Sequence, residues 1–283
     1  MIATARLAAG TGGRILGLRS EPPLSLRPTP DGVYLVGSAA GPLGGDDVRL
    51  EIDVEPGASL VIRSAAASVA LPGPAPSTLT VHARVGAGAE LRWLVEPTVA
   101  ARGCRHRIDA RIDLAIGARL HWIEEIILGR HGEPSGSVVS RFSVDLDGWP
   151  LLRHELALGP DHPHAQTSAA VGDARAVGTV VVIGGSGPTR PAVFGGWSGA
   201  GRPPRHPAPS ADPTSLFGPA AAVLPLAGCP GDDHPGFQVV ALAADRPTLR
   251  RLLDDGISLS GGTSQPGTEL RTGVRDPVPS WLR

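Results

Sequence analysis

Apolar and polar residues alternate with a period of two along four segments in the first half of the chain. Residues 48–54, 79–85, 108–114 and 142–146 carry an apolar side chain at every second position, with polar residues between them. Successive side chains of a strand point to opposite faces, so this alternation indicates strands with one buried face. We therefore predict that residues 33–158 form one strand after another.

A glycine–alanine pair recurs between these strands, at Gly57, Gly88 and Gly117. Each pair follows an alternating segment and opens another, at intervals of 31 and 29 residues along the sequence. Such spacing predicts a repeated unit of two strands that stacks on its neighbours. Glycine–alanine turns are also common in a chain with 38 glycines, but the strand polarity is in phase around each turn, which favours the repeat. The predicted fold class is mainly β, with β-solenoid-like or layered antiparallel sheets.

The composition changes near residue 184. Residues 185–236 are rich in glycine, proline and serine and predict an irregular excursion from the sheets. Residues 237–256 predict a strand followed by a helix, with Asp245 as its cap, Pro247 in the first turn, a leucine stripe and Gly256 at its end. We expect this small αβ element to close one end of the sheet stack, and residues 257–283 to be flexible.

Charge and composition exclude several classes of function. Apolar residues make up 41% of the chain and charged residues 19%, which is typical of a globular protein. The 26 basic and 27 acidic residues nearly cancel, so a nucleic-acid partner is not expected. Because the chain contains no lysine, the lysine chemistry of P-loop nucleotidases, kinases and Schiff-base enzymes is excluded.

The location is expected to be cytoplasmic. Glycine and arginine residues interrupt the first 18 residues, so no secretory signal is predicted, and no apolar run is long enough to cross a membrane. Cys104 and Cys229 lie far apart in the sequence. Two cysteines do not form a disulfide framework, and we expect both to be reduced.

Two catalytic patterns fail on their context. His162 and His164 flank a proline and have no third ligand at a recognisable spacing, so a stable metal site is not predicted. Ser186 lies in a glycine-rich stretch after an apolar segment, but prolines follow it where a nucleophile elbow requires a helix.

Carboxylates in apolar strand contexts are the remaining candidates. Glu124 and Glu125 are adjacent, so one of them is expected to face inward. A buried carboxylate needs a partner, for which Arg130 and Arg153 are the candidates. The simplest interpretation is a structural ion pair inside a sheet. A pair of carboxylates for glycoside hydrolysis is the enzymatic alternative, and a plain binding module is the third.

Several segments, in order, resemble the urease accessory proteins of the UreD (UreH) family. The GGD turn of that family matches Gly44, Gly45 and Asp46, and its GR-x-GE segment matches Gly129, Arg130 and Glu133. Further similar segments are WLVEP at residues 93–97, which contains Glu96, and DGWPL at residues 147–151, which Glu155 follows. The resemblance covers roughly residues 15–160.

The resemblance implies a single domain over residues 1–283, with a strand-rich core over about 15–184, and a non-catalytic role in urease maturation. It implies apo-urease, a UreF-type scaffold and a UreG-type GTPase as partners, and no tightly bound cofactor. Nickel would pass transiently, along an internal polar tunnel. We place Asp46, Ser64, Glu124, Glu125 and Glu155 along that path as a hypothesis, because oxygen ligands hold a divalent ion weakly. Gly44, Gly45, Glu96, Gly129, Arg130 and Glu133 are expected to be structural or to contact partners.

Overall fold

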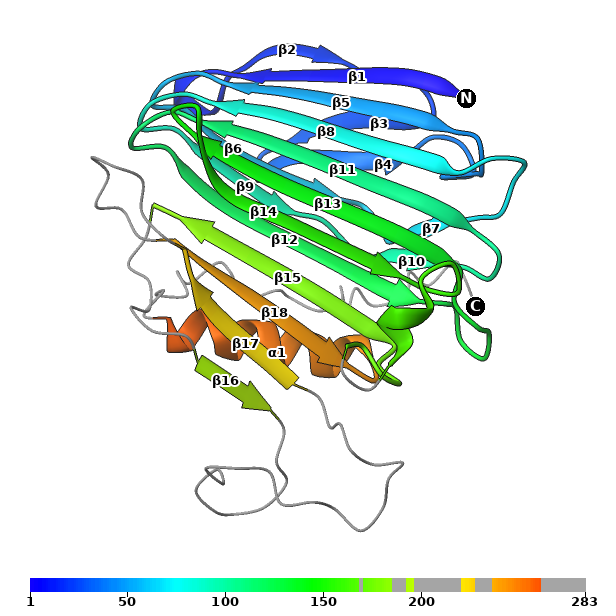
Figure 1. Cartoon of the computed structure of the whole chain (residues 1–283). Coiled ribbons are helices and arrows are strands. Elements are labelled where there is room, and N and C mark those ends of the chain that lie inside the picture. Colours follow the sequence, from blue (N-terminus) through cyan, green and yellow to red (C-terminus); the bar gives the residue numbers. More distant parts are fainter. Residues whose placement is uncertain (168–169, 185–191, 196–219, 227–235, 261–283) are drawn as a thin grey trace, which may run out of the picture.

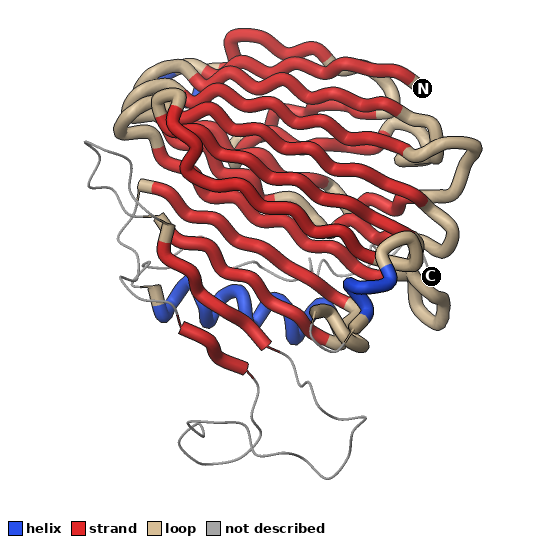
Figure 2. Tube along the Cα trace, viewed as in Figure 1, coloured by secondary structure: helices blue, strands red, loops and turns tan. Residues whose placement is uncertain are grey.

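The structure is a computed structural model that describes residues 1–167, 170–184, 192–195, 220–226 and 236–260. Two sheets lie face to face in this structure, and one α-helix packs on the second sheet (Figures 1 and 2). The fold is therefore mainly β, as the alternating pattern predicts.

The first sheet, sheet A, has seven strands in the order β14-β13-β11-β8-β5-β1-β2. Its central strands β1, β5, β8, β11 and β13 run parallel, and an antiparallel strand pairs at each edge. The strands are β1 (Ile2–Ala9), β2 (Ile15–Arg19), β5 (Asp47–Val54), β8 (Ser77–Val85), β11 (Arg105–Leu114), β13 (Ser137–Leu146) and β14 (Trp149–Leu158).

The second sheet, sheet B, has eleven strands, nine of them along the path β16-β17-β18-β15-β12-β9-β6-β4-β3, while β7 and β10 pair beside it. The strands are β3 (Leu24–Thr29), β4 (Gly32–Gly37), β6 (Ser59–Ser64), β7 (Ser68–Ala70), β9 (Glu90–Leu94), β10 (Thr98–Ala100), β12 (Arg119–Leu128), β15 (Ala176–Ile183), β16 (Ala192–Gly195), β17 (Ala220–Pro225) and β18 (Phe237–Ala243).

The three glycine–alanine turns carry the chain from sheet A to sheet B. Strands β5, β8 and β11 enter these turns, and β6, β9 and β12 leave them. Each strand pairs in parallel with its equivalent in the next repeat, as Leu60 does with Leu91 and Leu91 with Leu120. The flanking strands thus form coils of a solenoid rather than hairpins, and the predicted repeat of 31 and 29 residues is confirmed. Gly57, Gly88 and Gly117 adopt φ values of 69°, 65° and 75°, which favour glycine.

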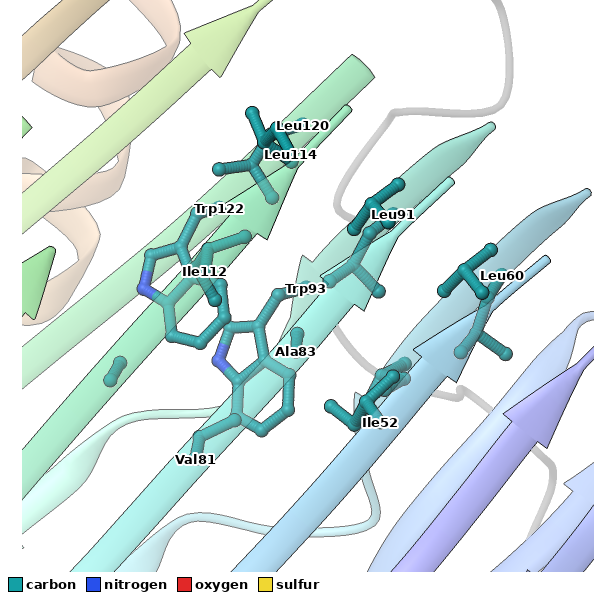
Figure 3. Close-up of a cluster of buried hydrophobic side chains, with 14 of the residues drawn as sticks. Ile52, Leu60, Val81, Ala83, Leu91, Trp93, Ile112, Leu114, Leu120 and Trp122 are labelled. Atoms are coloured by element: carbon teal, nitrogen blue, oxygen red, sulfur yellow. The ribbon is translucent and has the colours of Figure 1, made fainter. Parts of the chain in front are cut away.

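The main hydrophobic core lies between the sheets and repeats with the coils. Val81, Ala83 and Ile112 of sheet A face Leu91, Trp93 and Trp122 of sheet B (Figure 3). The rings of Trp93 and Trp122 stack with centroids 4.6 Å apart, because parallel in-register pairing places them on adjacent strands. Such stacks of large side chains hold successive coils in register.

Helix α1 (Arg246–Leu259) covers the outer face of sheet B (Figure 1). Asp245 caps it by accepting a 2.8 Å hydrogen bond from the Thr248 N–H, as predicted. Leu249 and Leu253 pack where Gly178 leaves room, because a Cβ at Gly178 would lie 2.8 Å from the Leu253 Cδ1 atom. Among the described residues, no helix combines the length and the hydropathy that a membrane span requires.

Three boundaries differ from the sequence prediction. The strand-rich core begins at Ile2 and not near residue 15, because small alanines in β1 weaken its alternating pattern. The excursion at residues 185–236 contains β16 and β17, which extend sheet B. Helix α1 continues through Gly256 to Leu259. The αβ element lies at the β16 side of sheet B, beyond the last coil, and α1 covers the outer face there.

Three further sequence predictions concern residues outside the described ones. These are the state of Cys229, the surroundings of Ser186 and the flexibility of residues 261–283. Cys104 is buried and forms no disulfide with a described residue.

Candidate functional site

Two adjacent carboxylates of β12 reach opposite faces of sheet B, as strand geometry requires. Glu124 lies on the face of Trp122, between the two sheets, where it interacts with Ser140 of β13. Glu125 lies on the outer face, below α1, and is only 2% exposed. The two side chains therefore belong to separate clusters.

Glu125 is held by two arginines of α1 that lie one helical turn apart. The Nε atom of Arg246 donates a 3.0 Å hydrogen bond to Glu125 Oε2, and Arg250 forms an ion pair with Oε1. Arg246 also forms an ion pair with Glu96, whose backbone N–H donates a 2.8 Å hydrogen bond to Ser64 Oγ. We call Ser64, Glu96, Glu125, Arg246 and Arg250 the helix anchor.

The helix anchor is a structural ion-pair network. Burial raises the pKa of Glu125, and the charges of Arg250 and Arg246 counteract that rise. The predicted partners Arg130 and Arg153 are wrong, since these residues pair with Glu133 and Asp145 instead. The sequence contained a usable signal, because Arg246 and Arg250 have the i, i+4 spacing that places two side chains on one face of a helix.

Glu124 is surrounded by polar groups in the inter-sheet core. Thr179 of β15 is its direct cross-strand neighbour, and the Trp122 indole lies beside it. Burial raises the pKa of Glu124, while Ser140 and Trp122 partly offset that rise by favouring the ionised form. The buried atoms Glu124 Oε1, Thr179 Oγ1 and Trp122 Nε1 make no hydrogen bond of good geometry with a described residue. Because buried polar atoms rarely lack partners, this cluster is suited to bind water or another polar guest.

The polar residues continue across the inner face of sheet A. Ser77 Oγ lies 2.8 Å from His106 Nδ1, and both side chains are buried. His106 and Ser140 lie on the adjacent parallel strands β11 and β13, two positions apart in register. We call Ser77, His106, Ser140, Glu124 and Thr179 the polar seam. It crosses the core from β8 to β15.

Asp46 lies beside one end of the polar seam. Its carbonyl oxygen accepts a 2.7 Å hydrogen bond from the N–H of Thr78, the residue after Ser77. Its carboxylate pairs with the N-terminal ammonium group and accepts a 2.9 Å hydrogen bond from the Leu43 N–H. Burial alone would raise the pKa of Asp46, but these two donors outweigh it and the pKa lies below its ordinary value.

Three of the five residues placed on the internal path lie elsewhere. Glu155 was expected to point inward, and this is wrong, because its side chain is 49% exposed on the outer face of sheet A and pairs with Arg141. It pairs in register with Arg141 and so shares that outward face. Ser64 and Glu125 belong to the helix anchor. Asp46 and Glu124 remain beside or within the inter-sheet core.

The geometry disfavours the enzymatic alternatives. Glu124 and Glu125 point away from each other, so they cannot act on one glycosidic bond from two sides. His162 and His164 lie at the 3₁₀ turn η2 (Pro163–Gln166). Within the part of the chain that the structure describes, no three His, Cys, Asp or Glu side chains gather as a metal site requires.

Comparison with known proteins identifies the family. Residues 3–255 match the UreD urease accessory protein family. The chain belongs to the UreD family. Among its relatives, the urease accessory protein UreD of Frankia alni is 46% identical over 239 residues, covering 78% of this chain and 71% of that protein. The UreD protein of Parafrankia sp. is 40% identical, with 96% and 89% covered, and UreD 3 of Streptomyces griseus is 42% identical, with 90% and 95% covered.

The GRHGE segment of this UreD-family chain forms a turn that is held by its own side chains and by hydrogen bonds from Arg102 and Arg175. Glu133 accepts hydrogen bonds from the Arg130 Nε atom at 2.8 Å and from the Arg130 backbone N–H at 2.9 Å. Arg130 thereby lowers the pKa of Glu133 to about 2. Gly129 has φ 81°, and a Cβ there would lie 2.7 Å from the Glu133 carbonyl oxygen. These contacts support a structural role for the segment.

The GGD turn packs backbone against backbone on a neighbouring loop. A Cβ at Gly44 would lie 2.5 Å from both the Cα and the N atoms of Gly73, and 2.7 Å from the Ala75 carbonyl oxygen. Gly45 adopts φ 97° and donates its N–H to the Pro76 carbonyl oxygen. The turn therefore requires glycine at both positions.

We expect the substitution Gly44→Ala to lower the free energy of unfolding by about 1–3 kcal/mol, because the contacting atoms are backbone and a shift of the loop is costly. Gly17→Ala is the matched control, since its Cβ would meet only the Ala8 Cβ at an ordinary 3.7 Å. Urea denaturation of both variants tests this expectation. Equal stability of the two variants would contradict the close approach at Gly44.

Proposed function

We propose that this chain is a non-catalytic maturation factor for urease that acts in the cytoplasm. Its membership of a urease accessory protein family is the observation that carries this proposal. Its partners are apo-urease, a UreF-type scaffold and a UreG-type GTPase. Nickel is the cargo of this process and not a resident cofactor.

The polar seam is the part of the fold that we propose for the passage of nickel. Glu124 supports this role, because it is a carboxylate between the two sheets whose Oε1 atom makes no hydrogen bond of good geometry with a described residue. The residue as a whole is intermediate in exposure, while its Oε1 atom is buried. The fold alone would not require an ionisable group there, since burying a charge is costly.

The chemistry of the polar seam suits a transient ion. Carboxylate and hydroxyl oxygens of Glu124, Ser140 and Thr179 are hard, weak ligands for a hydrated divalent cation. His106 is the single nitrogen ligand in the seam, and its Nδ1 atom is already bonded to Ser77. Fewer than three strong ligands converge, so the seam would hold nickel briefly and release it. Asp46 would lie at the approach to the seam.

Reconstitution in cells tests the maturation role. Urease subunits and the UreF- and UreG-type proteins are expressed in nickel medium with and without this chain, and ureolysis is measured. We expect activity to depend on the chain. Full activation in its absence, with all other proteins present at equal levels, would contradict the proposed function.

A further inference from the structure

Two large apolar side chains are exposed at one end of the sheet sandwich. Trp149 is 60% exposed and Ile116 is 56% exposed. Their two turns are joined by a hydrogen bond that the Asp147 N–H donates to the Leu114 carbonyl oxygen over 2.8 Å. Ile116 lies two residues after Leu114, and Trp149 lies two residues after Asp147. They therefore project from neighbouring turns. An exposed tryptophan leaves a large apolar area in water, and tryptophan is enriched among the residues that dominate binding energy at interfaces.

A tight hairpin turn carries Trp149. Strands β13 and β14 are joined by two residues, Asp147 with φ 49° and Gly148 with φ 82°, which is the pattern of a tight type I′ hairpin. Trp149 pairs in register with Leu146, which is buried in the core. The indole is thus presented by a fixed element, and little conformational entropy would be lost when a partner binds it.

An open groove lies beside these residues, across the carboxyl ends of β5, β8 and β11. Four carboxylates line it, those of Asp53, Glu55, Asp113 and Asp147, against one arginine, Arg84. Arg84 pairs with Asp53 at 3.1 Å, and Asp113 pairs with Arg111 at 3.2 Å. Glu55 and Asp147 form no ion pair with a described residue, so the groove keeps negative charge next to the apolar side chains.

We propose that this end of the sandwich is a docking surface for a partner protein segment in which arginine or lysine residues flank a large aliphatic side chain. The aliphatic side chain packs on Trp149 and Ile116, and the basic groups enter the groove beside Glu55 and Asp147. Charge complementarity selects this occupant, because an anionic lipid surface or an acidic segment would be repelled. The proposal does not rest on the role in urease maturation.

Binding of short labelled peptides to the full chain tests this proposal by fluorescence anisotropy. The probe is an Arg-Leu-Arg-Leu-Arg peptide, with Glu-Leu-Glu-Leu-Glu and Arg-Ser-Arg-Ser-Arg peptides as controls for charge and for the apolar anchor. We expect the first peptide alone to bind, and its affinity to fall as the salt concentration rises.

Two variants separate the apolar and the charged parts of the surface. Trp149→Ser and the double variant Glu55→Gln/Asp147→Asn are each expected to weaken binding by about tenfold or more. Leu43→Ser is the matched control and should bind as the unmodified chain does, because this 45% exposed leucine precedes β5 and the groove lies at the opposite end of that strand. Unfolding of each variant by urea verifies that it is folded. Equal binding of the three peptides, or unchanged binding by either test variant, would overturn the proposal.

Discussion

The substitution Glu125→Ala is expected to destabilise the protein by about 3–5 kcal/mol, because removing one partner of a buried ion pair leaves the other uncompensated. Arg250 would then lie against an apolar sheet face without the carboxylate that neutralises it, and Arg246 would keep only Glu96. Helix α1 would lose most of its polar attachment while its leucines kept their contacts. Urea denaturation followed by circular dichroism measures the loss.

Glu155→Ala is the matched control for this prediction. Glu155 also pairs with an arginine, but it is 49% exposed, and pairs exposed to solvent contribute at most about 1 kcal/mol. Replacing Arg250 by methionine in the Glu125→Ala background should restore part of the stability, because it removes the unpaired charge. A cost of less than about 1 kcal/mol for Glu125→Ala would show that the helix anchor is not needed for stability.

The second large effect is expected in acid. Burial lowers the pKa of His106 from 6.5 to about 4, so the folded state binds its proton less readily than the unfolded chain does. The contribution of neutral His106 to the free energy of unfolding is fully present above pH 6.5. It is lost as the pH falls from 6.5 to about 4. The loss has an upper limit of about 3 kcal/mol, at roughly 1.4 kcal/mol for each pH unit of difference. His121, whose pKa burial also lowers to about 4, adds a second contribution of the same sign.

The variant His106→Gln isolates this contribution. Its free energy of unfolding should depend less on pH between 6.5 and 4 than that of the unmodified chain, because one buried proton acceptor is gone. Carboxylates also titrate near pH 4, so the difference between the two proteins is the quantity to compare. His164→Gln, at an exposed residue of η2, is the control. Parallel pH profiles for all three proteins would contradict the assignment.

The coils of the fold could be predicted from the sequence because their signals are local. The alternation of apolar and polar residues along 48–54 and 79–85 indicates strands with one buried face, and the glycine after each strand indicates a turn. Strand β1 was missed because its buried positions include Ala3 and Ala5, which carry little hydrophobic signal. The sequence does not predict strand β17, because this strand lies within a segment rich in glycine and proline, which interrupt regular secondary structure.

The candidate site could be predicted only in part, since it depends on which distant strands meet. Because Glu124 and Glu125 are adjacent on one strand, the sequence predicts that their side chains point to opposite faces of the sheet. The order of the strands in the sheet decides which of these two faces α1 covers and which one faces sheet A. No local sequence pattern contains that order. Glu155 was placed inside because its strand contains leucines, yet β14 is an edge strand with exposed residues on both faces.

We propose that the interior of the sandwich, and not its charged outer face, serves urease maturation. Glu124→Gln keeps the size of the side chain and removes its charge, so the fold should persist. Ureolysis and the nickel content of purified urease are measured after co-expression with Glu124→Gln, with Glu155→Gln or with the unmodified chain. We expect Glu124→Gln to lower both quantities by about tenfold or more, by analogy with ligands and their supporting groups at metal sites, and Glu155→Gln to change neither. Full activation by a folded Glu124→Gln protein would contradict this proposal.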